Sequence, residues 1–213
     1  MAADLFLIGD SHIIAIADAA EDRGLTWKGG PLASGRALEQ YFWKIDGKKF
    51  IYSMEGAGPI RERFCDLLVF DGPILTTLGF NSHRFVEDFD KYAQAQKLSP
   101  SPSILSEAAF VDTVCDARHV ALEFYRMLSD HGCDVYFTAS PQRCTMQNHT
   151  LLRAFEDLLI AKIEATGAKF IETRDAVLDE QRVRSEYAKA DDPVHGSLAL
   201  GALILDRMAK LRG

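Results

Sequence analysis

Short apolar runs alternate with amphipathic helical patterns along most of this 213-residue chain. The apolar runs have the length of β-strands; they are Asp4–Ile8, Ile74–Leu78, Asp134–Thr138 and Lys169–Glu172. The helical patterns, in which apolar residues recur every three or four positions, cover residues 11–20, 85–96, 107–131, 151–166 and 198–211. Strands that alternate with helices predict a parallel sheet with helices on both faces. We therefore predict an α/β fold with a mostly parallel, doubly wound sheet.

Two further segments carry weaker strand patterns. Cys65–Phe70 is largely apolar and is followed by a turn signal, so we expect it to pair with the 74–78 run or to continue into it. Phe50–Ser53 is a shorter candidate. The segment 98–103, with the sequence LSPSPS, is interpreted as a surface loop, because the patterns on its two sides complete one another. We expect residues 1–213 to form a single domain.

The composition restricts the partners and the compartment. Hydrophobic residues make up 47% and charged residues 26%, as in ordinary globular proteins. The net charge is −7 and there is no basic block, which argues against nucleic acid or an anionic membrane as the main partner. The cysteines form no CxxC pair and have no histidine at a zinc-ligand spacing. We expect reduced thiols at all four positions, which are Cys65, Cys115, Cys133 and Cys144.

The N-terminal segment does not have the pattern of a secretory leader. Residues 1–10 contain no basic region, and the apolar run Leu5–Ile8 is too short for a signal peptide. The longest apolar stretches, at 13–17 and 198–205, fall short of the length that spans a bilayer. We therefore expect a soluble, cytoplasmic protein.

Ligands bind at the carboxyl ends of the strands in such sheets, so residues directly after predicted strands are candidates for chemistry. The first strand runs into Gly9-Asp10-Ser11-His12 and then into a helix. A serine at the start of a helix is a candidate nucleophile, because free N–H groups there stabilise developing negative charge. The alternative is that Asp10 or Ser11 only caps the helix.

A second candidate segment precedes the last helical pattern. Asp192 and His195 are three residues apart in a turn that contains Pro193. This spacing lets the carboxylate accept a hydrogen bond from one imidazole nitrogen, which leaves the other nitrogen to accept a proton. The alternative is that an aspartate caps the helix and that His195 is a polar surface residue.

Two more positions could stabilise an oxyanion. Asn81 follows the 74–78 strand in the sequence Gly79-Phe80-Asn81-Ser82-His83, and its side-chain amide could donate a hydrogen bond. Gly35, in the segment 32–36, could offer an unhindered backbone N–H, although an ordinary turn explains it equally well.

Taken together and in this order, the four segments resemble the conserved blocks of the SGNH (GDSL-type) hydrolase superfamily of esterases and lipases. The resemblance extends from Gly9 to His195, which is nearly the whole chain. It implies a flavodoxin-like, three-layer α/β/α domain. It also implies a carboxyl-ester hydrolase that needs no cofactor and no metal, with a small-molecule or carbohydrate ester as substrate.

The same resemblance implies roles for individual residues. Ser11 would be the nucleophile, His195 the general base and then acid, and Asp192 the carboxylate that orients His195. The oxyanion hole would consist of the Ser11 N–H, the Gly35 N–H and the Asn81 side-chain amide. The absence of an anchor favours a short acyl group, such as an O-acetyl group on a carbohydrate.

The sequence departs from the family pattern at two positions and suggests some pocket residues. His12 stands where the family usually has leucine or another small or apolar residue, and Ser82 where aspartate is frequent. The first departure predicts a second imidazole near the site. Neighbours in sequence that we expect to line the pocket are Phe80, His83, Arg36 and Val194.

Other functions fit the sequence less well. An acyltransferase would use the same triad and is the serious alternative, because the two reactions differ only in what attacks the acyl-enzyme. A receiver-like signalling module would need an acidic pair after the first strand, where Ser11 follows Asp10. A metal hydrolase is disfavoured because none of the candidate ligands His12, His83, His149 and His195 are four residues apart. Gly56-Ala57-Gly58 lacks the third glycine of a dinucleotide site.

Overall fold

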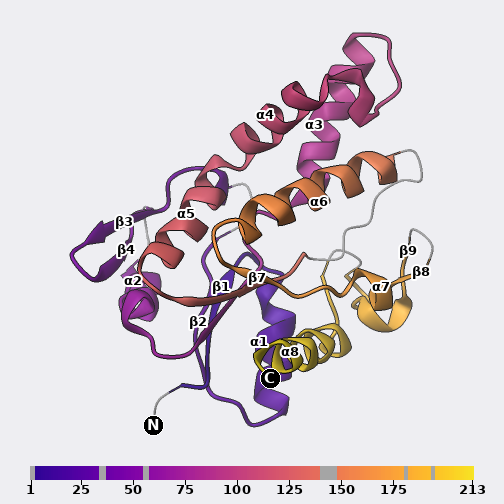
Figure 1. Ribbon diagram of the computed structural model, residues 1–213. Coiled ribbons are helices and arrows are strands. Elements are labelled where there is room, and N and C mark those ends of the chain that lie inside the picture. The colour runs from indigo at the N-terminus through magenta and orange to yellow at the C-terminus, as the bar shows by residue number, and fades with distance from the viewer. Residues whose placement is uncertain (1–2, 34–36, 55–57, 140–147, 180–181, 193–194) are drawn as a thin grey trace.

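A five-stranded parallel sheet forms the centre of the described part of the computed structural model (Figure 1). The structure describes residues 3–33, 37–54, 58–139, 148–179, 182–192 and 195–213. The strand order is β2-β1-β5-β6-β7, and each neighbouring pair is parallel. Counted within the sheet this is the order 2-1-3-4-5 of flavodoxin-like folds. The strands are β1 (Leu5–Gly9), β2 (Trp27–Pro31), β5 (Pro73–Thr76), β6 (Asp134–Phe137) and β7 (Lys169–Phe170).

Helices cover both faces of this sheet. The helices α1 (Ile13–Asp22) and α8 (Leu198–Arg212) lie together on one face (Figure 1). The other face carries α2 (Gly58–Phe64), α3 (Ser82–Ala95), α4 (Glu107–Ala117), α5 (His119–Asp130) and α6 (His149–Glu164). The architecture is therefore the predicted three-layer α/β/α arrangement. No helix in the described ranges combines the length and the apolar character that crossing a membrane requires.

Side chains of β1 alternate between the two cores. Leu5 and Leu7 pack in the cluster beneath α1 and α8, whereas Phe6 and Ile8 pack in the larger cluster on the opposite face. Neighbouring residues of a strand point to opposite faces, so a strand that is apolar throughout must be covered on both. The short apolar runs of the sequence therefore form central strands that are covered on both faces.

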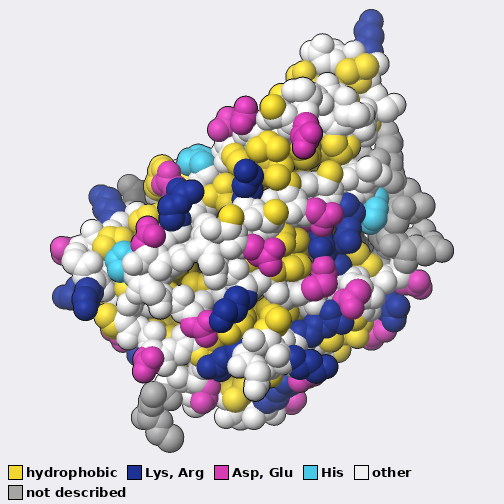
Figure 2. Space-filling model, in the orientation of Figure 1, with side chains coloured by type: hydrophobic (Ala, Val, Ile, Leu, Met, Phe, Trp, Pro, Cys, Tyr) yellow, Lys and Arg dark blue, Asp and Glu magenta, His cyan; other side chains and the backbone are white. Residues whose placement is uncertain are grey.

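Smaller elements lie outside the main sheet. An antiparallel hairpin pairs β3 (Trp43–Asp46) with β4 (Lys49–Tyr52), and a second one pairs β8 (Leu178–Asp179) with β9 (Arg182–Val183). The remaining short elements are α7 (Arg174–Val177) and the 3₁₀ turns η1 (Ala37–Glu39), η2 (Leu67–Val69), η3 (Pro102–Ile104) and η5 (Ser185–Tyr187). On the face that Figure 2 shows, acidic and basic side chains are interspersed.

The predicted strand Cys65–Phe70 is wrong. These residues follow α2 as a turn and then form η2, and Leu67 and Leu68 are both buried in the same cluster. Two consecutive side chains cannot reach the same face from an extended strand, whereas a helical turn allows it. The weaker candidate Phe50–Ser53 does correspond to a strand, β4, but it belongs to a hairpin rather than to the main sheet.

The strand β2 was missed because its sequence contains Lys28 and two glycines. Gly29 has a φ of +85°, and a Cβ on it would lie 2.1 Å from the carbonyl oxygen of Leu7 on the neighbouring strand. Only glycine allows β2 to approach β1 this closely. Glycine usually indicates an interruption of a strand, but here it permits β2 to pair with β1.

The helical pattern predicted over 107–131 is two helices. Arg118, between α4 and α5, has φ −125° and ψ 17°, which interrupts the helical path. Its buried guanidinium turns back to donate hydrogen bonds to the carbonyl oxygens of Gly79 (2.9 Å), Asn81 (3.3 Å) and Ala117 (2.8 Å). Apolar periodicity continues through both helices, so it does not reveal the break.

Candidate active site

Ser11 lies in the turn between β1 and α1. Gly9, which ends β1, leaves room for this turn, since a Cβ there would lie 2.3 Å from the Thr77 hydroxyl oxygen. The buried Asp10 carboxylate accepts hydrogen bonds from the backbone N–H of His12 (3.0 Å) and from the Thr77 hydroxyl (3.3 Å). Asp10 therefore holds the turn at the start of α1, and the Ser11 hydroxyl is directed to a different partner.

That partner is the imidazole of His195. The His195 Nε2 lies 2.7 Å from the Ser11 Oγ, and its Nδ1 lies 2.5 Å from the Asp192 Oδ2. An ionised carboxylate only accepts hydrogen bonds, so Nδ1 carries the hydrogen and donates it to Asp192. In the neutral ring Nε2 is then the acceptor for the Ser11 hydroxyl. The structure thus joins Asp192, His195 and Ser11 in one chain of hydrogen bonds.

The two ends of the chain meet because α8 packs closely on α1. Ser197 caps α8, and its Oγ accepts a hydrogen bond from the backbone N–H of Leu200. Gly201, one turn into the helix, faces α1, where a Cβ would lie only 1.9 Å from the carbonyl oxygen of Ala15. The absence of a side chain at Gly201 lets the two backbones touch. His195 precedes α8 and Ser11 precedes α1, so this contact sets the distance between them.

A second imidazole lies beside His195. The ring of His12 is centred 5.2 Å from that of His195, at an angle of 42°. Burial is the main cause that lowers the pKa of His12; the charges of His195 and His83 lower it further, while Asp10 raises it. A lowered pKa keeps His12 neutral, so it adds no positive charge next to the base.

Asn81 lies in the loop after β5, directly before α3, and is buried. Its Nδ2 donates a hydrogen bond to Glu39 Oε1 (3.0 Å), and the same nitrogen has a second hydrogen to offer. The Arg118 guanidinium binds the backbone of this loop and lies 3.9 Å from the Glu39 carboxylate. Burial lowers the pKa of Arg118 to about 10, so it remains charged at neutral pH.

Sequence reasoning did not identify Glu39 and Arg118 as neighbours of the site. Glu39 is 42 positions and Arg118 is 37 positions from Asn81 along the chain. Neither residue follows a strand of the main sheet, which was the signal used to find candidates. No local motif marks Arg118, since the same helical pattern also contains Arg126.

The structure places the other predicted site residues in different environments. Phe80 does not line an open pocket, because its side chain is fully buried and its ring stacks on Phe137 with centroids 5.9 Å apart. His83 is half-buried in the first turn of α3, near enough to His12 to affect its pKa. Three predictions, for Gly35, Arg36 and Val194, lie outside the described residues.

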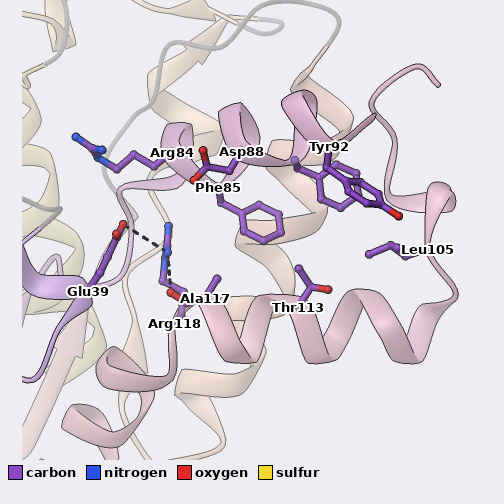
Figure 3. Close-up of a pocket in the computed structure, with 10 residues that line it drawn as sticks. Glu39, Arg84, Phe85, Asp88, Tyr92, Leu105, Thr113, Ala117 and Arg118 are labelled. Carbon is purple, nitrogen blue, oxygen red and sulfur yellow. Dashed lines mark hydrogen bonds and ion pairs between the residues drawn. The ribbon is translucent and has the colours of Figure 1, made fainter. Parts of the chain in front are cut away.

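Two cavities lie next to these groups. A small one of about 20 Å³ is bordered by Asp10, Gly79, Asn81 and Arg118, among others. A larger one of about 590 Å³ lies between α3 and α4 (Figure 3). In the described ranges, no three side chains of His, Cys, Asp or Glu are grouped so that they could hold a metal ion.

The cysteines are in the expected state where the structure describes them. Cys65, Cys115 and Cys133 are free thiols. Cys144 lies outside the described residues.

Comparison with known proteins gives matches only among solved structures. No protein-family model matches the chain, and no curated protein matches it. The lipase Lip_vut3 from a goat rumen metagenome matches with a TM-score of 0.58 and 15% identity, covering 97% of this chain and 95% of that one. Axe2, an acetylxylan esterase from Geobacillus stearothermophilus, matches with a TM-score of 0.51 and 13% identity, covering 99% and 93%.

These neighbours share the fold and only a small part of the sequence. Both align over nearly their whole length, as does a serine-to-alanine catalytic mutant of Axe2, with a TM-score of 0.52 and 13% identity. The chain therefore has the three-layer α/β/α fold of these solved lipase and acetylxylan esterase structures, which is the fold that the sequence resemblance implied.

Proposed function

We propose that the protein is a serine carboxyl-ester hydrolase. The observation that carries the proposal is the chain of hydrogen bonds from Asp192 through His195 to Ser11. It connects a hydroxyl, a base and a carboxylate in the order that nucleophilic catalysis requires. Lipase and acetylxylan esterase neighbours with the same fold support the assignment.

In the first half of the reaction, Ser11 becomes acylated. Its Oγ attacks the ester carbonyl carbon while the proton passes to Nε2 of His195. The resulting imidazolium is stabilised by the Asp192 carboxylate on Nδ1. When the tetrahedral intermediate collapses, the carbon–oxygen bond to the alcohol breaks, and the alcohol leaves with the proton from His195.

In the second half, water replaces the alcohol. His195 takes a proton from the water, whose oxygen bonds to the acyl carbon. The bond to Ser11 Oγ then breaks, and the proton returns from His195 to the serine. The enzyme is regenerated and the acid is released, so the reaction balances with one ester and one water consumed.

Negative charge on the carbonyl oxygen must be stabilised in both halves. We assign this role to the second N–H of the Asn81 amide, together with the backbone N–H groups of Ser11 and Gly35 that the family resemblance implies. Glu39 holds the Asn81 amide by accepting its other hydrogen, and Arg118 holds the backbone of the same loop. Donors fixed in place before the reaction lower the barrier most effectively.

The substrate class is a small-molecule or carbohydrate ester. The sequence predicts a short acyl group, such as O-acetyl, and the acetylxylan esterase neighbour is consistent with that prediction. An acyltransferase differs only in the nucleophile of the second half. Addition of an oligosaccharide acceptor distinguishes the two: a hydrolase releases free acid at an unchanged rate, and a transferase forms a new ester.

The direct test replaces the nucleophile. Ser11→Ala is expected to reduce the kcat for p-nitrophenyl acetate by at least about 10³-fold, because the acyl-enzyme can no longer form. Ser103→Ala, at an exposed serine whose hydroxyl bonds that of Ser101, is the matched control and should retain full activity. Circular dichroism checks that both variants are folded. Undiminished hydrolysis by Ser11→Ala would refute the proposal.

A further inference from the structure

A large cavity lies on the helical side of the sheet that carries α3 and α4. It is a groove of about 590 Å³ between α3 and α4, which we call the α3–α4 groove (Figure 3). Pockets of roughly 300–1,000 Å³ are the size that holds small organic ligands. In the described part of the chain, neither Ser11 nor His195 lines it. A groove of this size can hold a small organic group.

The walls of the groove change in character along its length. Figure 3 shows Glu39 and Arg118 at one end, and Tyr92 and Leu105 toward the other. Phe85 contributes an aromatic face between them. Arg84 and Asp88 add charged side chains on the α3 wall, so the part of the groove that can bind an apolar ligand body lies around Phe85, Tyr92 and Leu105.

The charged end of the groove leads to the candidate active site. Glu39, Ala117 and Arg118 line the groove and also border the small cavity of about 20 Å³. Asp10, the neighbour of Ser11, and Asn81 also border the small cavity. The groove therefore adjoins a cavity that the proposed oxyanion donor lines.

The connection is narrow in this structure. A volume of about 20 Å³ is roughly that of one water molecule, so an aliphatic chain requires more room. The Glu39 side chain stands in the passage, where it contacts Asn81 and Arg118. It is 37% exposed and must stay on Asn81 for the proposed reaction, so an acyl chain has to pass on the solvent side of Glu39.

We propose that the α3–α4 groove binds the acyl chain of an aliphatic ester, a proposal that rests on the serine-hydrolase function above. The leaving alcohol takes its proton from His195 and must lie on the His195 side of Ser11. The carbonyl oxygen faces the Asn81 amide, so the acyl chain takes the remaining direction at the tetrahedral carbon, which we assign to the cavity shared with the groove. A groove with apolar walls then favours acyl chains longer than acetyl, in contrast to the short chain predicted from the sequence.

The test fills the groove where it meets the small cavity. Ala117→Leu places a larger side chain at this junction. The readout is the ratio of kcat/KM for p-nitrophenyl octanoate to that for p-nitrophenyl acetate. The ratio should fall by about 10-fold or more, because a few displaced methylene groups change binding by that amount. Ala108→Leu makes the same change at an exposed position of α4 that does not line the groove, and its ratio should equal that of the wild type.

A second variant covers the case in which Ala117→Leu does not fold. Thr113 also lines the groove, one helical turn or roughly 6 Å from Ala117. Thr113→Leu should lower the octanoate ratio while leaving the ratio of butyrate to acetate closer to that of the wild type, because it shortens the groove rather than closing it. An unchanged octanoate ratio in folded Ala117→Leu or Thr113→Leu would overturn the proposal.

Direct binding separates this inference from the proposed reaction. Octanoate is titrated by calorimetry into the Ser11→Ala protein with and without Ala117→Leu. If the protein hydrolyses no ester but Ala117→Leu weakens octanoate binding by about 10-fold or more, the groove site stands and the hydrolase proposal fails. If Ser11-dependent hydrolysis is present but neither octanoate binding nor the ratio responds, the hydrolase stands and the groove proposal fails. Loss of a dimer in Ala117→Leu, with the ratio unchanged, would instead identify a second copy of the chain as the occupant.

Discussion

At the scale of single residues, the site depends on which side chain holds the first turn of α1. Asp10 fixes the turn before α1 by accepting hydrogen bonds from the His12 N–H and the Thr77 hydroxyl. The Ser11 hydroxyl is therefore available to His195 instead of to the helix N-terminus. A serine and an aspartate in adjacent positions thus have separate tasks: the aspartate fixes the backbone, and the serine is positioned for chemistry.

Asn81 provides the sharpest prediction at this scale. Asn81→Ala should lower kcat for p-nitrophenyl acetate by about 10²- to 10³-fold, because one oxyanion donor is lost. KM should change little, since the amide stabilises charge that exists only in the transition state. Steady-state kinetics with the purified variant checks this. A change confined to KM would show that Asn81 binds substrate rather than stabilising the oxyanion.

The residues that the sequence identified and those it did not differ in a physical way. Ser11, Asn81 and His195 lie directly after strands or before a helix, in short motifs whose chemistry can be recognised locally. Glu39 and Arg118 act on Asn81 from distant segments, and their roles depend on burial and on contacts that appear only in the folded chain. Phe80 shows the opposite case. It lies within the motif and was predicted to line the pocket, but its ring is buried in the core.

At the scale of helices and strands, the elements could be predicted where the hydrophobic pattern was strong. The prediction failed where tertiary contacts decided the local structure. The apolar runs predicted β1, β5, β6 and β7, and the periodic segments predicted the long helices. β2 was missed because its glycines are required by close contact with β1. The break at Arg118 was missed because the guanidinium binds carbonyl groups on another segment.

A buried carboxyl group on α6 predicts that the stability of the fold depends on pH. Glu156 is 4% exposed, and Arg174 Nη1 lies 3.8 Å from its Oε2. Burial raises the pKa of Glu156 from 4.5 to about 7, against the opposing effects of Arg174 and of a hydrogen bond with Ser82. A carboxyl pKa that is higher in the folded state stabilises the fold below pH 4.5, and this stability is lost as the pH rises through 7.

The matching variant is Glu156→Gln. Between pH 5 and pH 8 the wild type should lose about 2 kcal/mol more of its free energy of unfolding than Glu156→Gln does, because glutamine does not ionise. Urea denaturation at the two pH values measures the difference. Glu164→Gln, at an exposed glutamate of the same helix, should behave as the wild type. If Glu156→Gln shows the same pH dependence as the wild type, Glu156 does not ionise in this range.

At the scale of the whole molecule, the topology brings the first and last parts of the chain to one edge of the sheet. β1 is flanked by β2 and β5, so the loops after β1 and β5 lie side by side at the carboxyl ends of the strands. The final helix packs on α1 through Gly201 and delivers His195 to the same edge. Residues 184 positions apart thereby form one site.

The most direct measurement of the central claim is covalent labelling with a fluorophosphonate, followed by mapping of the adduct by mass spectrometry. Only a serine activated by a neighbouring base reacts rapidly with this reagent. We predict one adduct, on the peptide that contains Ser11, and its loss in His195→Ala. An adduct on a different residue, or no adduct on the folded wild-type protein, would contradict the account.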